Sequence, residues 1–141
     1  MTFTPIKHSD TQVNLAQFKA AGGFPNPCEN NLVESVSLDS LIIKNKNSTF
    51  LFRVSGHSMA PAISDGAIIV VDRSITPASG QVVLATLDGD FVVKELHLNK
   101  DQAHFKSWNP DYPTKTIQID IESSWEEGNI WGVVTSAIHI F

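Results

Sequence analysis

The sequence has little cysteine, a shortage of positive charge and no long apolar run, and each shortage excludes a class of protein. One cysteine, Cys28, stands among the 141 residues, so no disulfide can form within the chain, which suits a reducing compartment. Lysine and arginine number 10 against 15 acidic residues. The resulting net charge of -5 argues against direct binding of a nucleic-acid backbone by this chain.

The sequence also lacks a segment apolar enough for a signal peptide or a membrane-spanning helix. The N-terminal residues MTFTPIKHSDTQ have no hydrophobic centre, and the strongly apolar run AIIVV is far too short to cross a bilayer. Hydrophobic residues make up 42% of the chain and charged residues 18%, as expected for a packed globular domain. We therefore predict a soluble, cytoplasmic protein.

Two segments near the start of the chain differ in composition from the rest. Residues 10–21, DTQVNLAQFKAA, predict a short helix with Asp10 as its N-cap. The segment that follows, GGFPNPCENN, is rich in glycine, proline and asparagine, which predicts an extended or turning linker. We predict a flexible N-terminal arm, residues 1–22, joined to one domain formed by residues 23–141.

The rest of the chain is dominated by β-strand patterns. Residues 37–45 predict a short helix capped by Ser37. The pair Asp88 and Gly89 predicts a two-residue hairpin turn. Runs of β-branched and aromatic residues predict strands in TFLFRVSG, AIIVVDR, GQVVLATL, DFVVKELHL, KTIQIDI and IWGVVTSAIHIF. These elements predict a mainly β domain, with an antiparallel sheet that is twisted or curled into a barrel.

Residues 54–73, VSGHSMAPAISDGAIIVVDR, place Ser58 in a turn ahead of an apolar strand. A serine hydroxyl is a weak nucleophile until a neighbouring base takes its proton. Lys94 is a candidate base, because strand alternation over residues 91–98 places it on the more apolar face. Its amine could extend along that face to water, or it could be buried with a lowered pKa and act as a general base. Spacing alone leaves both interpretations open.

Other residues that could carry chemistry give weaker patterns. His57 adjoins Ser58, but neighbouring residues of an extended stretch point apart, which disfavours His57 as the base. Cys28 lacks the local signature of a nucleophilic cysteine. The tryptophans are expected in the core or at its rim: Trp108, Trp125 and Trp131. No metal site and no cofactor are predicted, since the remaining histidines lack the spacing of zinc ligands: His8, His97, His104 and His139.

Three motifs, in order along the chain, resemble one family. GHSMAPAISDG with AIIVVDR, followed by DGDFVVKEL, resembles the S24 self-cleaving serine peptidases, which include the LexA repressor. GGFPNP resembles the self-cleavage segment of the UmuD-type branch, the SOS mutagenesis proteins. The resemblance covers about residues 18–135 and implies a fold like those of LexA and the signal peptidases. The loop SMAPAISDG is one residue shorter than in the UmuD type and contains Pro61.

The resemblance also implies residue roles. Ser58 matches the nucleophile and Lys94 the general base. The bond that is cut is Gly22–Gly23 or, in the alternative alignment, Ala21–Gly22. No cofactor is implied. The 22 residues before the bond are too few for the helix-turn-helix domain of LexA-type repressors, so direct binding of DNA is not expected.

The partners that the resemblance implies are a second copy of the chain in a homodimer, a RecA–single-stranded DNA filament that stimulates cleavage, and a Y-family translesion DNA polymerase subunit of the UmuC type. Two other functions remain open. The chain could be a non-catalytic dimeric module that regulates a DNA polymerase, or a peptidase that acts mainly on other proteins.

Overall fold

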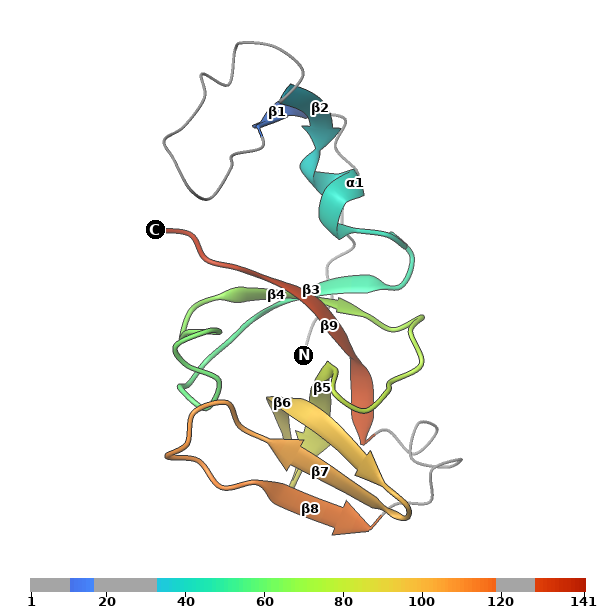
Figure 1. The fold of residues 1–141 in the computed structure, drawn as a ribbon, viewed down its shortest axis with the longest axis vertical. Helices are drawn as coiled ribbons and strands as arrows, with labels where there is room; N and C mark the ends of the chain where they lie inside the picture. The colour runs from blue at the N-terminus through green and yellow to red at the C-terminus, as the bar shows by residue number, and fades with distance from the viewer. Residues whose placement is uncertain (1–10, 17–32, 119–128) are drawn as a thin grey trace.

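The structure, a computed structural model, describes residues 11–16, 33–118 and 129–141. Within these ranges the protein consists of β-strands and one short helix (Figure 1). The strands form a seven-stranded antiparallel sheet and a separate two-stranded sheet. Both faces of the large sheet contribute to buried apolar clusters, so the predicted mainly β, LexA-like class is confirmed.

The large sheet has the strand order β3-β4-β9-β5-β6-β7-β8. Its strands are β3 (Thr49–Arg53), β4 (Ile68–Asp72), β5 (Val82–Leu87), β6 (Asp90–Asn99), β7 (Gln102–Lys106), β8 (Lys115–Gln118) and β9 (Ile130–Ile138). Each predicted run overlaps one of these strands, and β6 extends one residue beyond its run, to Asn99. The sequence analysis missed β7, because the buried face of QAHFK consists of just two residues, Ala103 and Phe105.

The hairpin between β5 and β6 has the turn that its sequence predicts. Leu87 pairs with Asp90, and the two residues between them, Asp88 and Gly89, have φ angles of 52° and 85°. Two consecutive residues with positive φ are typical of the type I′ turn, whose twist matches that of the adjoining strands. This turn fixes the register of β6 against β5 and therefore the position of Lys94, which pairs with Val83.

Two apolar clusters form the core, and β5 contributes to both. Alternate residues of β5 point to opposite faces, so Val83 joins one cluster and Leu84 the other. The second cluster also includes Met59 and Ile63, which belong to the loop between β3 and β4. Burial of these two side chains anchors the loop that carries Ser58.

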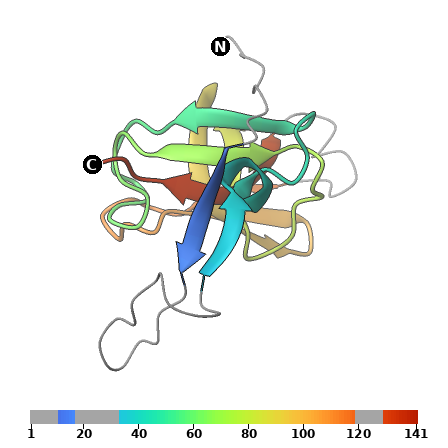
Figure 2. The ribbon, with the colours of Figure 1, turned by 90° about the horizontal axis from the view of Figure 1, so that it is seen from above.

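The predicted helix over residues 10–21 is wrong where the structure describes it. Residues 12–16 form β1 (Gln12–Ala16), which pairs antiparallel with β2 (Val33–Ser37). Val13 and Leu15 alternate with polar neighbours, a pattern that also fits a strand, and pairing with β2 satisfies the backbone polar groups. Figure 2 shows β1 and β2 side by side, on the β3–β4–β9 side of the large sheet.

The short helix predicted near residues 37–45 is present as α1 (Leu38–Ile42), with Ser37 at the N-cap position. Among the described residues, no helix is long and apolar enough to cross a membrane.

Candidate active site

Ser58 lies in the loop between β3 and β4 and is half-buried. Near the start of the loop is Gly56, whose φ of 107° is a conformation that favours glycine. The Gly56 N–H donates a hydrogen bond to Asp65 Oδ1 at 2.8 Å, which ties the start of the loop to its end. Between them, the backbone N–H of Ile63 donates to the Met59 carbonyl at 3.0 Å. The side chains of Met59 and Ile63 are 2% and 4% exposed, so their burial in the core anchors the loop.

Lys94 lies in the middle of β6 and is half-buried. Its Nζ donates a hydrogen bond to Ser107 Oγ at 2.8 Å, and Nζ lies 5.9 Å from the ring centroid of Tyr112. Burial lowers the pKa of the Lys94 amine below its usual range, because desolvation disfavours the ammonium form. The environment therefore favours the neutral amine that a general base requires.

The three residues after β7, Ser107–Asn109, contact both Ser58 and Lys94, and we call them the bridge segment. The backbone N–H of Asn109 donates to the Ser58 carbonyl at 2.9 Å, and Asn109 Nδ2 donates to the His57 carbonyl at 3.0 Å. At its other end the bridge segment accepts the hydrogen bond from Lys94. Ser58 and Lys94, which are 36 positions apart in the chain, are thus linked through one short segment.

The hydrogen bonds within the described residues join Lys94 Nζ to Ser107 rather than to Ser58. The sequence analysis missed Ser107 and Asn109. The signal available was SWNPDYP, whose composition indicates a turn but no chemistry. Their roles depend on the register of β7 against β6, and β7 itself was not predicted.

Trp108, the middle residue of the bridge segment, ties it to the Ser58 loop and to β6. Its backbone N–H lies 3.3 Å from Met59 Sδ, and its indole Nε1 donates to Glu95 Oε2 at 2.6 Å. His97 Nε2 lies 2.5 Å from the other carboxylate oxygen of Glu95. Hydrogen bonds from Trp108 and then His97 hold the pKa of Glu95 below its usual range. This carboxylate therefore braces the segment and is poorly suited to be a base.

Two of the tryptophans lie in the described residues. Trp108 is 38% exposed, so it stands at the rim of the core. Trp131 packs against the second cluster and contacts three aromatic rings: Phe50, Phe52 and Phe91.

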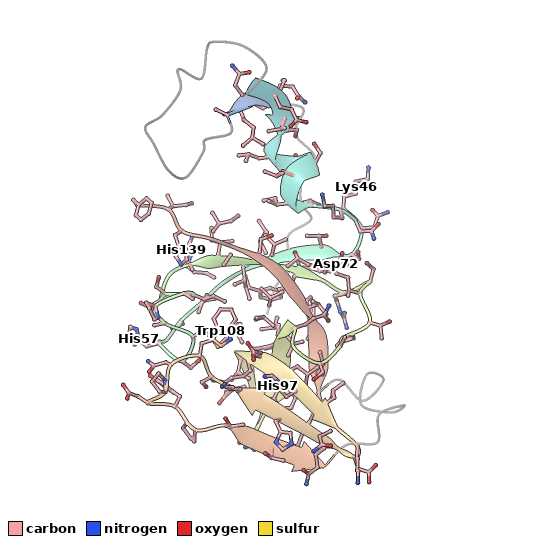
Figure 3. All side chains as sticks on the ribbon, in the orientation of Figure 1. Lys46, His57, Asp72, His97, Trp108 and His139 are labelled. Atoms are coloured by element: carbon pink, nitrogen blue, oxygen red, sulfur yellow. The ribbon has the colours of Figure 1, made fainter. Side chains whose placement is uncertain are left out.

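The described histidines lie in different parts of the fold and do not form a cluster. His57 and Trp108 lie on the same side of the molecule, away from Asp72 and Lys46 (Figure 3). His104 is hydrogen-bonded to Thr116. The ring of His139 accepts a long hydrogen bond from the Ser64 N–H at 3.4 Å. No group of three or more histidine, cysteine, aspartate or glutamate side chains among the described residues could hold a metal ion.

The residues of the predicted cleavage bond lie outside the described residues, as do several other candidates: Ala21, Gly22, Gly23, His8, Cys28 and Trp125.

Comparison with known proteins identifies the family. A family model described as Peptidase S24-like matches residues 14–135, nearly the whole chain. The chain belongs to the peptidase S24 family. Among curated members, Protein MucA of Salmonella typhimurium is 35% identical over 121 residues, which cover 85% of this chain and 80% of MucA. Protein SamA of Salmonella typhimurium strain LT2 is 35% identical over 122 residues, which cover 86% of this chain and 81% of SamA.

A repressor of the S24 family is similar over a smaller share of its length. The LexA repressor of Alcanivorax borkumensis is 32% identical over 117 residues, which cover 82% of this chain but 56% of the repressor. Together with MucA and SamA, this match confirms the predicted S24 protein of the UmuD type. The chain is thereby a member of a family of self-cleaving serine peptidases related to the SOS response.

Proposed function

We propose that this S24 protein cleaves its own chain, with Ser58 as the nucleophile and Lys94 as the general base. The observation that carries the proposal is the half-buried Lys94 amine, whose lowered pKa favours its neutral form. The bridge segment adds support, because it is hydrogen-bonded to Lys94 through Ser107 and to Ser58 through Asn109.

The proposed reaction proceeds in two stages. Neutral Lys94 accepts the proton of Ser58 as Oγ attacks the carbonyl carbon of Gly22, and backbone N–H groups of the loop, that of Ser58 among them, stabilise the oxyanion. The Lys94 ammonium then donates its proton to the amide nitrogen of Gly23, and the C–N bond breaks. Lys94 next activates a water, which hydrolyses the ester on Ser58 and releases the carboxylate of residues 1–22. Ala21–Gly22 is the alternative bond.

The composition around the proposed bond suits a substrate that is part of the same chain. Glycine and alanine permit a close approach of the backbone to the nucleophile, and Pro25 favours an extended conformation at Phe24. A tethered substrate has a high effective concentration, so cleavage must be restrained by conformation. Residues 1–22 are accordingly proposed as a removable arm of the domain formed by residues 23–141.

We further propose that this activity belongs to the SOS response in the cytoplasm. In this proposal a RecA–single-stranded DNA filament stimulates cleavage, and the shortened chain acts as a homodimeric accessory subunit of a UmuC-type Y-family translesion polymerase. The similarity to UmuD-type proteins such as MucA supports this role. The presence of both Ser58 and Lys94 favours the peptidase over a non-catalytic interaction module.

The rate of self-cleavage is expected to rise with pH. The folded pKa of Lys94 lies below its ordinary value, so the neutral amine becomes the dominant form as pH rises through that lowered value. The rate of loss of intact chain, measured by mass spectrometry from about pH 7 to about pH 10, should therefore increase and then level off. Circular dichroism at each pH checks that the fold persists. A rate independent of pH would exclude Lys94 as the base.

Asn109→Ala is expected to slow self-cleavage by about threefold to tenfold, because the hydrogen bond from Nδ2 to the His57 carbonyl beside Ser58 is lost. The rate at the high-pH plateau measures this loss. Asp111→Ala is the control, since it changes an exposed side chain in the same turn and should leave the rate unchanged. Equal rates for wild type and Asn109→Ala would show that the side chain does not support the Ser58 loop.

A further inference from the structure

Ser107, the residue directly after β7, has a buried hydroxyl that is hydrogen-bonded to the proposed base. Leu96 pairs with Phe105 and Glu95 with Lys106, so the next step of the same register places Ser107 opposite Lys94. Ser107 is 5% exposed, whereas Lys106 before it and Trp108 after it are exposed. A buried hydroxyl requires a hydrogen-bond partner. The partner of its oxygen is Lys94 Nζ, at 2.8 Å.

The hydrogen bond has a consequence for the direction of the lone pair. A neutral amine has two N–H donors and one lone pair, and a general base must direct that lone pair at the proton it removes. When Ser107 Oγ accepts one N–H, it limits the torsion of the Lys94 amine. The same bridge segment is bound to the Ser58 carbonyl, so the amine is fixed relative to the loop of the nucleophile.

The surroundings of Lys94 explain why a hydroxyl suits this position better than a carboxylate. From β5 the cross-strand neighbour is the apolar Val83, and the titratable group near Nζ on the loop side is the phenol of Tyr112. The pair that follows Lys94 in the β6–β7 ladder is Glu95 with Lys106, both charged. The Glu95 carboxylate accepts a hydrogen bond from Trp108. An uncharged acceptor can therefore orient the amine without favouring the ammonium as an anion would.

We propose that Ser107 is a positioning residue that directs the Lys94 amine toward Ser58. This inference rests on the proposed role of Lys94 as the base. Its hydroxyl oxygen holds one N–H of the neutral amine and leaves the lone pair free for the Ser58 proton. Ser107 touches neither the scissile bond nor the attacking oxygen in this scheme and acts through Lys94 alone.

Three substitutions at this position separate orientation from folding. Ser107→Ala removes the acceptor and should lower the high-pH plateau rate by about tenfold, because a misoriented base costs on the order of 10- to 100-fold, with no upward shift of the pH midpoint. Ser107→Thr keeps the hydroxyl and should restore at least half of the wild-type plateau. Ser107→Asp places an anion beside the amine and should raise the midpoint by about one unit or more. The midpoint shift in Ser107→Asp tests whether this position adjoins the amine, whereas a plateau loss in Ser107→Ala at an unchanged urea midpoint, restored by Ser107→Thr, separates orientation from folding.

The pKa of Lys94 can also be read without cleavage. In a Ser58→Ala background, NMR titration of the Lys94 Cε resonance should give a higher pKa in Ser107→Asp than with Ser107 intact. An unchanged Lys94 pKa, or a wild-type plateau in Ser107→Ala, would overturn the positioning role. If wild type fails to cut through Ser58 at all, the proposed function fails. If wild type cuts through Ser58 and Ser107→Ala equals it, the positioning role alone fails.

Discussion

Replacement of Ser58 with alanine is expected to abolish self-cleavage. In the proposed reaction Oγ of Ser58 forms the bond to the substrate carbonyl, and removal of a catalytic nucleophile lowers turnover by roughly 10⁴- to 10⁶-fold. Intact mass after incubation at about pH 10 should show wild type without residues 1–22, or 1–21 for the alternative bond, and Ser58→Ala whole. The loop should keep its shape in the variant, because Met59 and Ile63 anchor it.

Ser55→Ala is the matched control, because it removes an exposed hydroxyl earlier in the same loop and should cut at the wild-type rate. If wild type remains whole alone, the comparison is repeated with RecA, single-stranded DNA and nucleotide. Cleavage of Ser58→Ala at the same bond would assign the nucleophile elsewhere. A wild-type chain that stayed whole even with the filament would favour the non-catalytic interaction module.

Lys94→Arg and Lys94→Met are both expected to stop cleavage, for different reasons. Arginine retains the positive charge and remains protonated throughout the accessible pH range, so it cannot accept the Ser58 proton. Methionine has a similar length but no basic nitrogen. A lysine that only fills space or carries charge would tolerate at least one of these changes. Cleavage rates at about pH 10 decide between these possibilities, because neutral lysine is most abundant there.

Stability measurements can show that these variants lose chemistry rather than structure. Because the pKa of Lys94 is lowered in the folded state, its buried positive charge reduces the free energy of unfolding. This reduction is fully present when pH lies below the folded pKa, and it disappears as pH rises past the unfolded pKa of about 10. Lys94→Met removes this buried charge but also the partner of the buried Ser107 hydroxyl, so the two effects offset and the variant should unfold in urea close to the wild-type midpoint at about pH 7. Full activity in Lys94→Arg would rule out proton transfer to this side chain.

The strands could be predicted from the sequence because their side chains alternate and their ends carry turn residues. Asp88 and Gly89 even specify the register of β6, since two positive φ angles fit one type of hairpin. The prediction of a helix over the segment Gln12–Ala16 was wrong, because five residues with two apolar members fit both a helical and a strand periodicity. Pairing with β2, which is distant in the sequence, makes the segment a strand.

The candidate site was predictable only in part. Ser58 and Lys94 carry local patterns and lie in motifs that resemble the family. Ser107 and Asn109 have no such pattern, because a hydroxyl opposite Lys94 acquires meaning only when the strands are aligned. Burial of the Lys94 amine likewise depends on side chains from elements far apart in the sequence.

The pairing of β1 with β2 separates cutting from release. β1 precedes the proposed bond and β2 follows it. Hydrolysis would therefore leave two pieces of chain that are still paired through the β1–β2 ladder, which runs from the pair Gln12 and Ser37 to the pair Ala16 and Val33. A two-stranded pair is marginally stable in water, and β1 buries little, since its apolar residues Val13 and Leu15 are 44% and 37% exposed. The peptide should therefore dissociate on dilution, with a lifetime set by this ladder. Denaturing mass spectrometry would record the nick, whereas gel filtration would record the departure of the peptide.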